Sequence, residues 1–146
     1  MTRMRARNLP RSRYRHLGKK STATVIVVDD DASMRRALRT QLQVLGFNVL
    51  VCQSAEELLA SEFPADDACL LLDVWMPGMN GIELCRRLDA AGRRWPTILM
   101  SGLEDEKTTQ IMREAEPIPR LFKPFEEKQL IRAVRKALSK SVNLLY

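Results

Sequence analysis

The stretch CLLLDVWMPG at residues 69–78 decides the fold of this chain. Its first four residues are apolar and predict a buried strand, while Pro77 and Gly78 predict a turn just beyond it. Asp73 therefore stands at the carboxyl end of a strand. Open parallel sheets bind their ligands at that end, so Asp73 is the first candidate functional residue.

Polar and charged residues follow other apolar runs in the same way. Asp29 and Asp30 follow the run VIVV, Lys123 follows LF, and Ser101 follows TILM. Because the carboxyl ends of parallel strands meet at one edge of a sheet, these side chains are expected near Asp73. Three acids and one lysine indicate a metal-bound anion site, and phosphoryl transfer onto Asp73 is the chemistry that fits it best.

Strand-like runs alternate with amphipathic helical patterns along most of the chain. Strands are predicted at Thr24–Val28, Asn48–Cys52, Cys69–Leu72, Pro96–Met100 and Arg120–Phe122, and helices at about 33–45, from 54, after 81, at about 104–115 and at about 126–139. Strict alternation implies a parallel sheet with helices on both faces. The predicted fold is therefore α/β, a flavodoxin-like, doubly wound, five-stranded parallel sheet with five helices.

The composition of the strands predicts their order as 2-1-3-4-5. The first, third and fourth runs are the most uniformly apolar and belong in the centre. The second run contains Asn48, and the fifth follows Pro119, which has no N–H for a ladder, so both suit the edges. In this order the ligand site lies at the switch point between strands 1 and 3, where Asp29, Asp30 and Asp73 are placed.

Two of the helical patterns carry further detail. Ser54 and Glu57 have the spacing of a capping box at the start of the second helix. The fourth helix is the most polar, and only Ile111 and Met112 are expected to face the core.

The charge of the chain is unevenly distributed. Its 146 residues suit one domain and carry a net charge of +6. Residues 1–20 hold eight Lys or Arg and no acid, which leaves 16 of the 24 basic residues against 18 acids in the remainder. We expect a basic, disordered tail at 1–21, one domain at 22–141 and a short tail at 142–146. The basic tail is interpreted as a solvated extension, with nucleic acid or anionic lipid binding as the less favoured alternative.

Nothing in the sequence predicts secretion or membrane insertion. The N-terminus lacks the apolar core of a signal peptide, and the apolar runs are too short to span a bilayer. Cys52, Cys69 and Cys85 are widely spaced and are interpreted as reduced core residues rather than metal ligands. A cytoplasmic location is expected.

The three acids require a counter-charge. Carboxylates of Asp29, Asp30 and Asp73 at adjacent strand ends repel each other and raise each other's pKa values. A divalent cation relieves this repulsion, and ligation by a few carboxylate oxygens suits Mg²⁺. Asp73 is then the nucleophile, while Lys123 supplies positive charge and Ser101 a hydroxyl donor for the phosphoryl oxygens.

Four motifs together resemble the receiver domain of bacterial two-component response regulators. They are VVDDDASMRRAL at 27–38, LLLDVWMPGMNG at 70–81, ILMSG at 98–102 and FKPF at 122–125. The order and spacing of the motifs make the resemblance specific, and it covers about residues 22–140. It is consistent with the flavodoxin-like fold, of which a receiver is a known example.

The resemblance implies a role for each matching residue. These roles are Asp73 as the phospho-acceptor, Asp30 as a direct ligand of Mg²⁺, Asp29 as a largely water-mediated ligand, the backbone carbonyl of Trp75 as a further metal ligand, Ser101 as the switch hydroxyl and Lys123 as the phosphate-binding lysine. The implied donor is a phosphohistidine on a sensor histidine kinase or phosphotransfer protein. Output would pass through protein contacts to an unidentified partner, and catalysis would be limited to the chain's own phosphorylation and slow dephosphorylation.

One position departs from the receiver pattern. Receivers usually carry Tyr, Phe or His three residues before the lysine, and this chain carries Arg120 there. Burying an unpaired guanidinium is costly, so we expect the Arg120 side chain to stay outward, with its head in water. The protein would then signal without an aromatic residue that turns inward on activation. The alternative is that Arg120 turns inward to bind the phosphoryl group.

Other interpretations remain open at this point. Acids at strand-to-helix turns often cap helices, which is the simplest alternative for Asp29, Asp30 and Asp73. A receiver-like interaction module that no longer uses phosphate is the main functional alternative. An aspartyl phosphohydrolase is less favoured, because such enzymes typically place a general acid two residues after the nucleophile, where this chain has Trp75.

Overall fold

The computed structural model describes residues 23–102, 106–115 and 117–143. In chain order the elements are β1 (Thr24–Val28), α2 (Ala32–Val44), β2 (Asn48–Cys52), α3 (Ala55–Leu59), β3 (Ala68–Asp73), α4 (Gly81–Ala90), β4 (Thr97–Ser101), α5 (Glu106–Glu114), β5 (Arg120–Phe122) and α6 (Glu127–Asn143). The prediction of a disordered tail at residues 1–21 falls outside the described residues.

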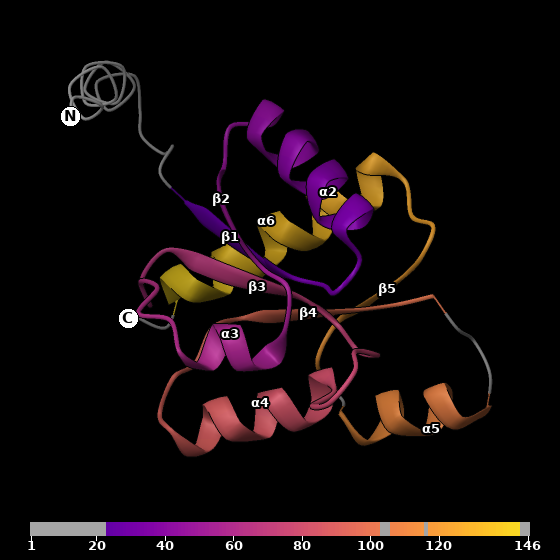
Figure 1. The fold of residues 1–146 in the computed structure, drawn as a ribbon. Helices are drawn as coiled ribbons and strands as arrows, with labels where there is room; N and C mark the ends of the chain where they lie inside the picture. Colours follow the sequence, from indigo (N-terminus) through magenta and orange to yellow (C-terminus); the bar gives the residue numbers. More distant parts are fainter. Residues whose placement is uncertain (1–22, 103–105, 116, 144–146) are drawn as a thin grey trace.

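The five strands form one parallel sheet in the order β2-β1-β3-β4-β5 (Figure 1). The predicted order is confirmed, with the strand that contains Asn48 at one edge and the strand after Pro119 at the other. β1 and β3 are buried along their whole length, as expected for central strands covered on both faces.

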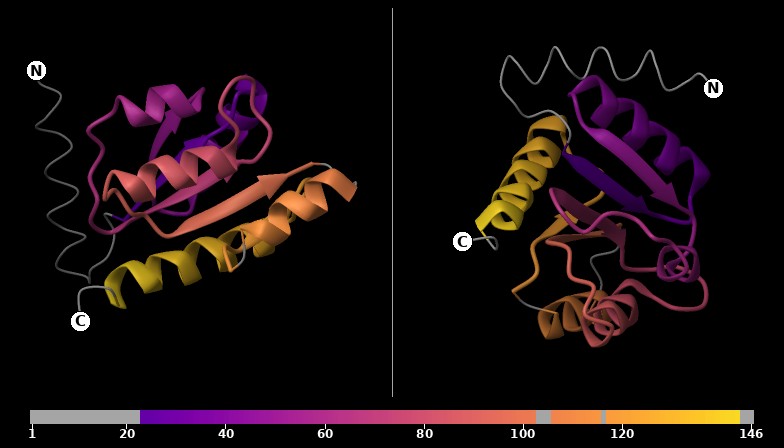
Figure 2. Two further views of the ribbon diagram at one scale, coloured as in Figure 1. Left: turned by 90° about the horizontal axis from the view of Figure 1, so that it is seen from below. Right: turned by 90° about the vertical axis from the view of Figure 1, so that its left-hand side faces the viewer.

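Helices cover both faces of the sheet. Figure 1 and the right-hand view of Figure 2 show α2 and α6 on one face and α3, α4 and α5 on the other. Side chains of alternate strand residues point to opposite faces, so Ile26, Leu70 and Leu72 pack under the three helices. Their neighbours Val27 and Leu71 pack under α2 and α6. The sheet is therefore held rigidly between two apolar layers.

The register of the central strands aligns their carboxyl ends. Val28 lies opposite Cys52 on β2 and Leu72 on β3, and Asp73 lies opposite Met100 on β4. The residues that follow these positions therefore emerge together at one edge of the sheet.

Helices α2, α3 and α4 begin at caps other than the three candidate acids. Asp31 caps α2 by accepting hydrogen bonds from the backbone N–H groups of Ser33 and Met34, and Asn80 caps α4. The capping interpretation of Asp29, Asp30 and Asp73 is therefore wrong. The capping box of α3 is confirmed in part, because Ser54 accepts from the N–H of Glu57 while Glu57 accepts from Gln53, one residue before the cap.

Two helices differ from their predicted form. α6 runs to Asn143, beyond the expected end near residue 139, because no glycine or proline interrupts it. In α5 the buried side chains are Thr108 and Met112, whereas Ile111 is only half-buried. Thr108 was not expected inside, because a hydroxyl gives no apolar signal in a sequence pattern.

The backbone of α4 packs tightly against the end of β3 at Gly81. A Cβ built on Gly81 would lie 2.6 Å from the backbone oxygen of Asp73 and 3.1 Å from the Cα of Val74. The Gly81 N–H donates to the carbonyl of Val74 at 2.8 Å. This position therefore needs glycine for close approach of two backbones.

Gly81→Ala is expected to lower the free energy of unfolding by about 1–3 kcal/mol, the usual cost of forcing a group into packed space. That cost outweighs the gain of up to about 1 kcal/mol that alanine brings to a helix. Urea denaturation of both proteins measures the difference. Gly102→Ala is the matched control, because among the described residues its added methyl group meets the Lys123 side chain, at an ordinary contact distance of 3.9 Å. Equal stability of Gly81→Ala and the parent protein would contradict this packing.

Candidate functional site

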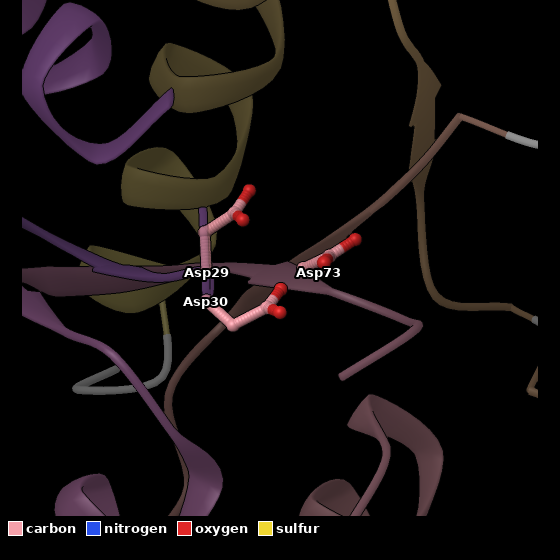
Figure 3. Close-up of side chains that lie close together, drawn as sticks. All are labelled: Asp29, Asp30 and Asp73. Atoms are coloured by element: carbon pink, nitrogen blue, oxygen red, sulfur yellow. The ribbon is translucent and has the colours of Figure 1, made fainter. Parts of the chain in front are cut away.

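Three carboxylates gather at the carboxyl edge of the sheet. Asp29 and Asp30 follow β1, and Asp73 ends β3. One carboxylate oxygen from each lies within 4.8 Å of the others. Figure 3 shows the three side chains extending from the two strand ends into one region. The structure thus brings together the three acids that the sequence placed at the switch point.

Lys123 lies against two of these acids. Its Nζ is 2.9 Å from Oδ2 of Asp29 and 3.6 Å from Oδ1 of Asp73. The lysine follows β5, and its backbone N–H donates to the carbonyl of Ser101 at 2.8 Å, which ties the end of β5 to the end of β4. The Lys123–Pro124 peptide bond is cis. One ammonium thus faces a cluster of three carboxylates.

The three acids have different surroundings. Asp29 is completely buried, and its two oxygens accept from the Lys123 ammonium and from the N–H of Asp31 at 3.0 Å. The side chain of Arg35 donates to the backbone carbonyl of Asp29 at 2.8 Å. Asp30 is exposed, and Asp73 is only 6% exposed. Both carboxylate oxygens of Asp29 therefore already accept hydrogen bonds from this chain, whereas the Asp30 carboxylate is open to solvent.

The pKa of Asp73 is raised from its ordinary value of 3.8 to about 6. Burial is the main cause, and the charge of Asp29 adds to it, while Lys123 acts in the opposite direction. The pKa of Lys123 lies above its ordinary value: burial lowers it, but the hydrogen bond to Asp29 and the charge of Asp73 outweigh that effect. The site is therefore short of positive charge despite the lysine.

This donor set fits a hard divalent cation. The open Asp30 carboxylate and the Asp73 carboxylate are oxygen ligands within reach of one ion, and a cation there would offset the repulsion that raises the Asp73 pKa. Cysteines do not take part, since Cys52 and Cys69 are buried in the core and burial raises the pKa of each thiol to about 12.

Ser101 and Trp75 complete the set of predicted site residues. Ser101 is fully buried at the end of β4, one residue beyond the partner of Asp73 in the ladder. The indole of Trp75 is directed to α5, where its Nε1 donates to Oγ1 of Thr108 at 3.0 Å and Lys107 lies over the ring at 5.4 Å. The metal-ligand role of the Trp75 carbonyl stays a prediction.

Several neighbours of the site were not identified from the sequence alone. Gly81 sets the approach of α4, Arg35 holds the carbonyl of Asp29, and Thr108 binds the Trp75 indole. Gly81 stands inside the motif LLLDVWMPGMNG, so the motif contained a signal for it. Arg35 and Thr108 lie on helices whose polar residues look alike in a sequence, and no pattern distinguishes them.

None of the helices in the described residues combines the length and apolarity that a bilayer span requires.

Comparisons with known proteins agree with this geometry. The family described as "Response regulator receiver domain" matches residues 25–135. "Nodulation protein W" of Bradyrhizobium diazoefficiens is 34% identical over 119 residues, covering 82% of this chain and 52% of that protein. "Transcriptional regulatory protein FixJ" of Azorhizobium caulinodans is 35% identical, covering 80% and 56%. The crystal structure described as FixJ-N superposes with a TM-score of 0.72 at 33% identity, covering 80% of this chain and 94% of that one.

Removing the charge of Asp73 is expected to stabilise the metal-free protein near neutral pH. The folded pKa of about 6 lies above the ordinary 3.8, so the folded state binds the extra proton between these pH values. Stability from this group is therefore present at pH 4 and falls as the pH rises through 6. At about 1.4 kcal/mol per pKa unit, Asp73→Asn should gain about 1–3 kcal/mol at pH 7.5.

Urea denaturation in EDTA at pH 4.5 and pH 7.5 measures this difference. The gain should be small at pH 4.5 and larger at pH 7.5, and Asp66→Asn, which changes an exposed acid outside the site, is the matched control and should show little change at either pH. A loss of stability for Asp73→Asn at pH 7.5 would show that Asp73 is not under electrostatic strain.

Proposed function

The chain belongs to the receiver domain family of two-component response regulators, and we propose that phosphorylation of Asp73 is its switch. The chain spans about half the length of the curated relatives it matches. The proposal therefore concerns the receiver itself. Its domain is proposed at residues 22–141 between two terminal tails, although α6 continues to Asn143.

The single observation that supports this role most is the environment of Asp73. It ends a central strand beside two further acids and a lysine, and its carboxylate is under electrostatic strain. Asp29 is held by two donors, so Asp73 is the buried acid better placed to act as a nucleophile. Its oxygen would attack the phosphorus of a phosphohistidine, the P–N bond would break, and the imidazole would leave.

The proposed metal is Mg²⁺, which would neutralise developing charge on the phosphoryl group when bound. Asp30 is proposed as a direct ligand because its carboxylate is open. Asp29 is proposed to act largely through water, because both of its oxygens already accept hydrogen bonds. The Trp75 backbone carbonyl is proposed as a further ligand on the basis of the family pattern.

Lys123 and Ser101 are proposed to receive the phosphoryl oxygens. The Lys123 ammonium stands 3.6 Å from Asp73, where it can pair with an anion attached to that carboxylate. Ser101 ends the neighbouring strand and is joined to the Lys123 backbone. These groups orient and neutralise the transferred phosphoryl group, which is most of what such a reaction requires.

The alternative of a receiver-like module that no longer depends on phosphate is not favoured. The three acids and the lysine that suit phosphoryl transfer come together at one edge of the sheet, which favours the phosphate-dependent role. A phosphohydrolase is also not favoured, because the side chain two residues after Asp73 is the Trp75 indole, which binds Thr108 and is no general acid.

The proposed partners are a sensor histidine kinase or phosphotransfer protein on the input side and an unidentified protein on the output side, in the cytoplasm. Arg120 is exposed on β5, which supports the expectation that it lies outward. We propose that it remains outward after phosphorylation. Binding of nucleic acid by the basic tail stays the less favoured alternative.

Acetyl phosphate with Mg²⁺ is expected to add one phosphoryl group to the protein, on Asp73. Intact-mass spectrometry should show the adduct for the wild type and no adduct for Asp73→Asn. Asp66→Asn, which changes an exposed acid outside the site, should be labelled like the wild type. Equal labelling of wild type and Asp73→Asn would assign the phosphoryl group elsewhere.

Asp30→Ala is expected to weaken Mg²⁺ binding by more than about tenfold, because it removes a direct charged ligand. Ser101→Ala should leave Mg²⁺ affinity nearly unchanged, since the hydroxyl is proposed to touch only the phosphoryl group. Titration followed by tryptophan fluorescence is suitable, because Trp75 is two residues from Asp73. Similar losses in the two variants would show that these roles are assigned wrongly.

A further inference from the structure

The Trp75 side chain links the acidic site to a distant part of the chain. Trp75 follows Asp73 by two residues, yet its indole N–H donates to the hydroxyl of Thr108 on α5, 33 residues away in sequence. Thr108 is 1% exposed and Trp75 is half-buried, so this hydrogen bond is partly shielded from water. Breaking it would remove a partner from the buried Thr108 hydroxyl, which has a cost in free energy.

α5 has few other buried anchors. Of its nine residues only Thr108 and Met112 are buried. One of these two holds the Trp75 indole, and Lys107, the residue before it, places its ammonium over the same ring at 5.4 Å. Elements with few buried contacts open or shift at low free energy and are the ones that serve as switches. A small displacement of the Trp75 indole therefore affects one of the two buried side chains that hold α5 in place, together with Lys107 next to it.

The backbone between Asp73 and Trp75 leaves little room to absorb a change. Val74 is completely buried, its N–H donates to Met100 on β4 at 2.9 Å, and its carbonyl accepts from Gly81 on α4 at 2.8 Å. Because Val74 is fixed on both sides, a displacement at the Trp75 backbone carbonyl, the further ligand proposed for the metal, is not spread back along β3 and acts on Trp75 itself.

The opposite route, through β5, is poorly suited to carry the same information. Its position three residues before Lys123 is the exposed Arg120 instead of an aromatic ring that could fill space inside. Phe122, the only aromatic residue of β5, is 39% exposed.

We propose that the Trp75 indole, through its contacts with Thr108 and Lys107, couples occupancy of the acidic site to the position of α5. Trp75 is a positioning residue in this scheme, and α5 is the element that reports the state of Asp73. The inference rests on the proposed function, since it assumes that a metal and a phosphoryl group occupy the site.

Hydrogen–deuterium exchange of the segment 106–114 tests the coupling in the full chain. Exchange is measured with EDTA and with Mg²⁺ plus beryllofluoride, a phosphoryl mimic, in the wild type, Thr108→Val, Trp75→Phe and Thr108→Ser. Thr108→Val is nearly isosteric but cannot accept the indole hydrogen bond, whereas Thr108→Ser keeps the hydroxyl and is the matched control. Trp75→Phe keeps a ring but removes the donor, so the test survives failure of either variant to fold.

In the wild type and Thr108→Ser, the mimic should change the exchange rate of α5 by about fivefold or more, the size of a typical coupling. In Thr108→Val, which changes no residue proposed to bind the metal or the phosphoryl group, this difference should collapse while the variant still binds the mimic. Trp75→Phe should show the same collapse when exchange is measured at a mimic concentration that saturates it. If the hydrogen bond is merely structural, α5 would exchange faster in both conditions with the difference retained, and the inference would be overturned. An α5 that does not respond in the wild type despite bound mimic would also overturn it.

Binding of the mimic is measured separately by ¹⁹F NMR, which distinguishes failure of the proposed function from failure of the coupling through Trp75. Absence of a bound-fluoride signal in the wild type would contradict the proposed function, and the inference with it. A bound signal together with an uncoupled or unresponsive α5 would contradict the inference alone.

Discussion

The contact between the Lys123 ammonium and the buried carboxylates of Asp29 and Asp73 is the constraint on which the site depends. Asp29 is completely buried, and an uncompensated charge there would be expensive. At 2.9 Å the lysine satisfies Asp29, while its distance of 3.6 Å from Asp73 leaves that acid only partly compensated. Removing one partner of such a buried pair usually costs about 3–5 kcal/mol. The structure therefore maintains an under-compensated acidic cluster whose remaining negative charge one divalent cation can offset.

This arrangement of charges requires the carboxyl ends of β1, β3 and β5 to lie at one edge of the sheet. Asp29 comes from β1, Asp73 from β3 and Lys123 from the end of β5, so their contacts exist only in the order β2-β1-β3-β4-β5. Buried aliphatic layers on both faces fix that order. The residual strain on Asp73 is a local loss of stability, offset by the core, and it favours binding of a metal ion at the site.

Most of the fold could be predicted because the strands of this sheet are short, apolar runs that end in polar residues. Asp29, Asp30, Asp73 and Lys123 were placed correctly, since the carboxyl end of a strand is visible in sequence. The different structural roles of Asp29, Asp30 and Asp31 could not be predicted, because they are three successive residues of the same type. Only the path of the backbone after β1 decides where each carboxylate points. The structure assigns Asp31 to the helix cap and Asp29 to the lysine.

Sequence was least informative around α5. Its polar pattern concealed Thr108, which is buried because it binds an indole rather than because it is apolar. The same region contains Arg120 in place of the usual aromatic residue. Thr108 and Arg120 both bear on how a change at the acidic site alters the surface of the protein. Such coupling depends on individual side-chain contacts, which the periodicity of a sequence does not encode.

A carbon-13 NMR titration of the Asp73 carboxyl group tests the central claim most directly. The resonance can be assigned by its absence from Asp73→Asn. In EDTA the pKa of Asp73 should be about 6. Saturating Mg²⁺ should lower this pKa below about 4, because the cation stabilises the carboxylate. An Asp73 pKa near its ordinary value in EDTA, unmoved by Mg²⁺, would contradict the account of an under-compensated acidic site.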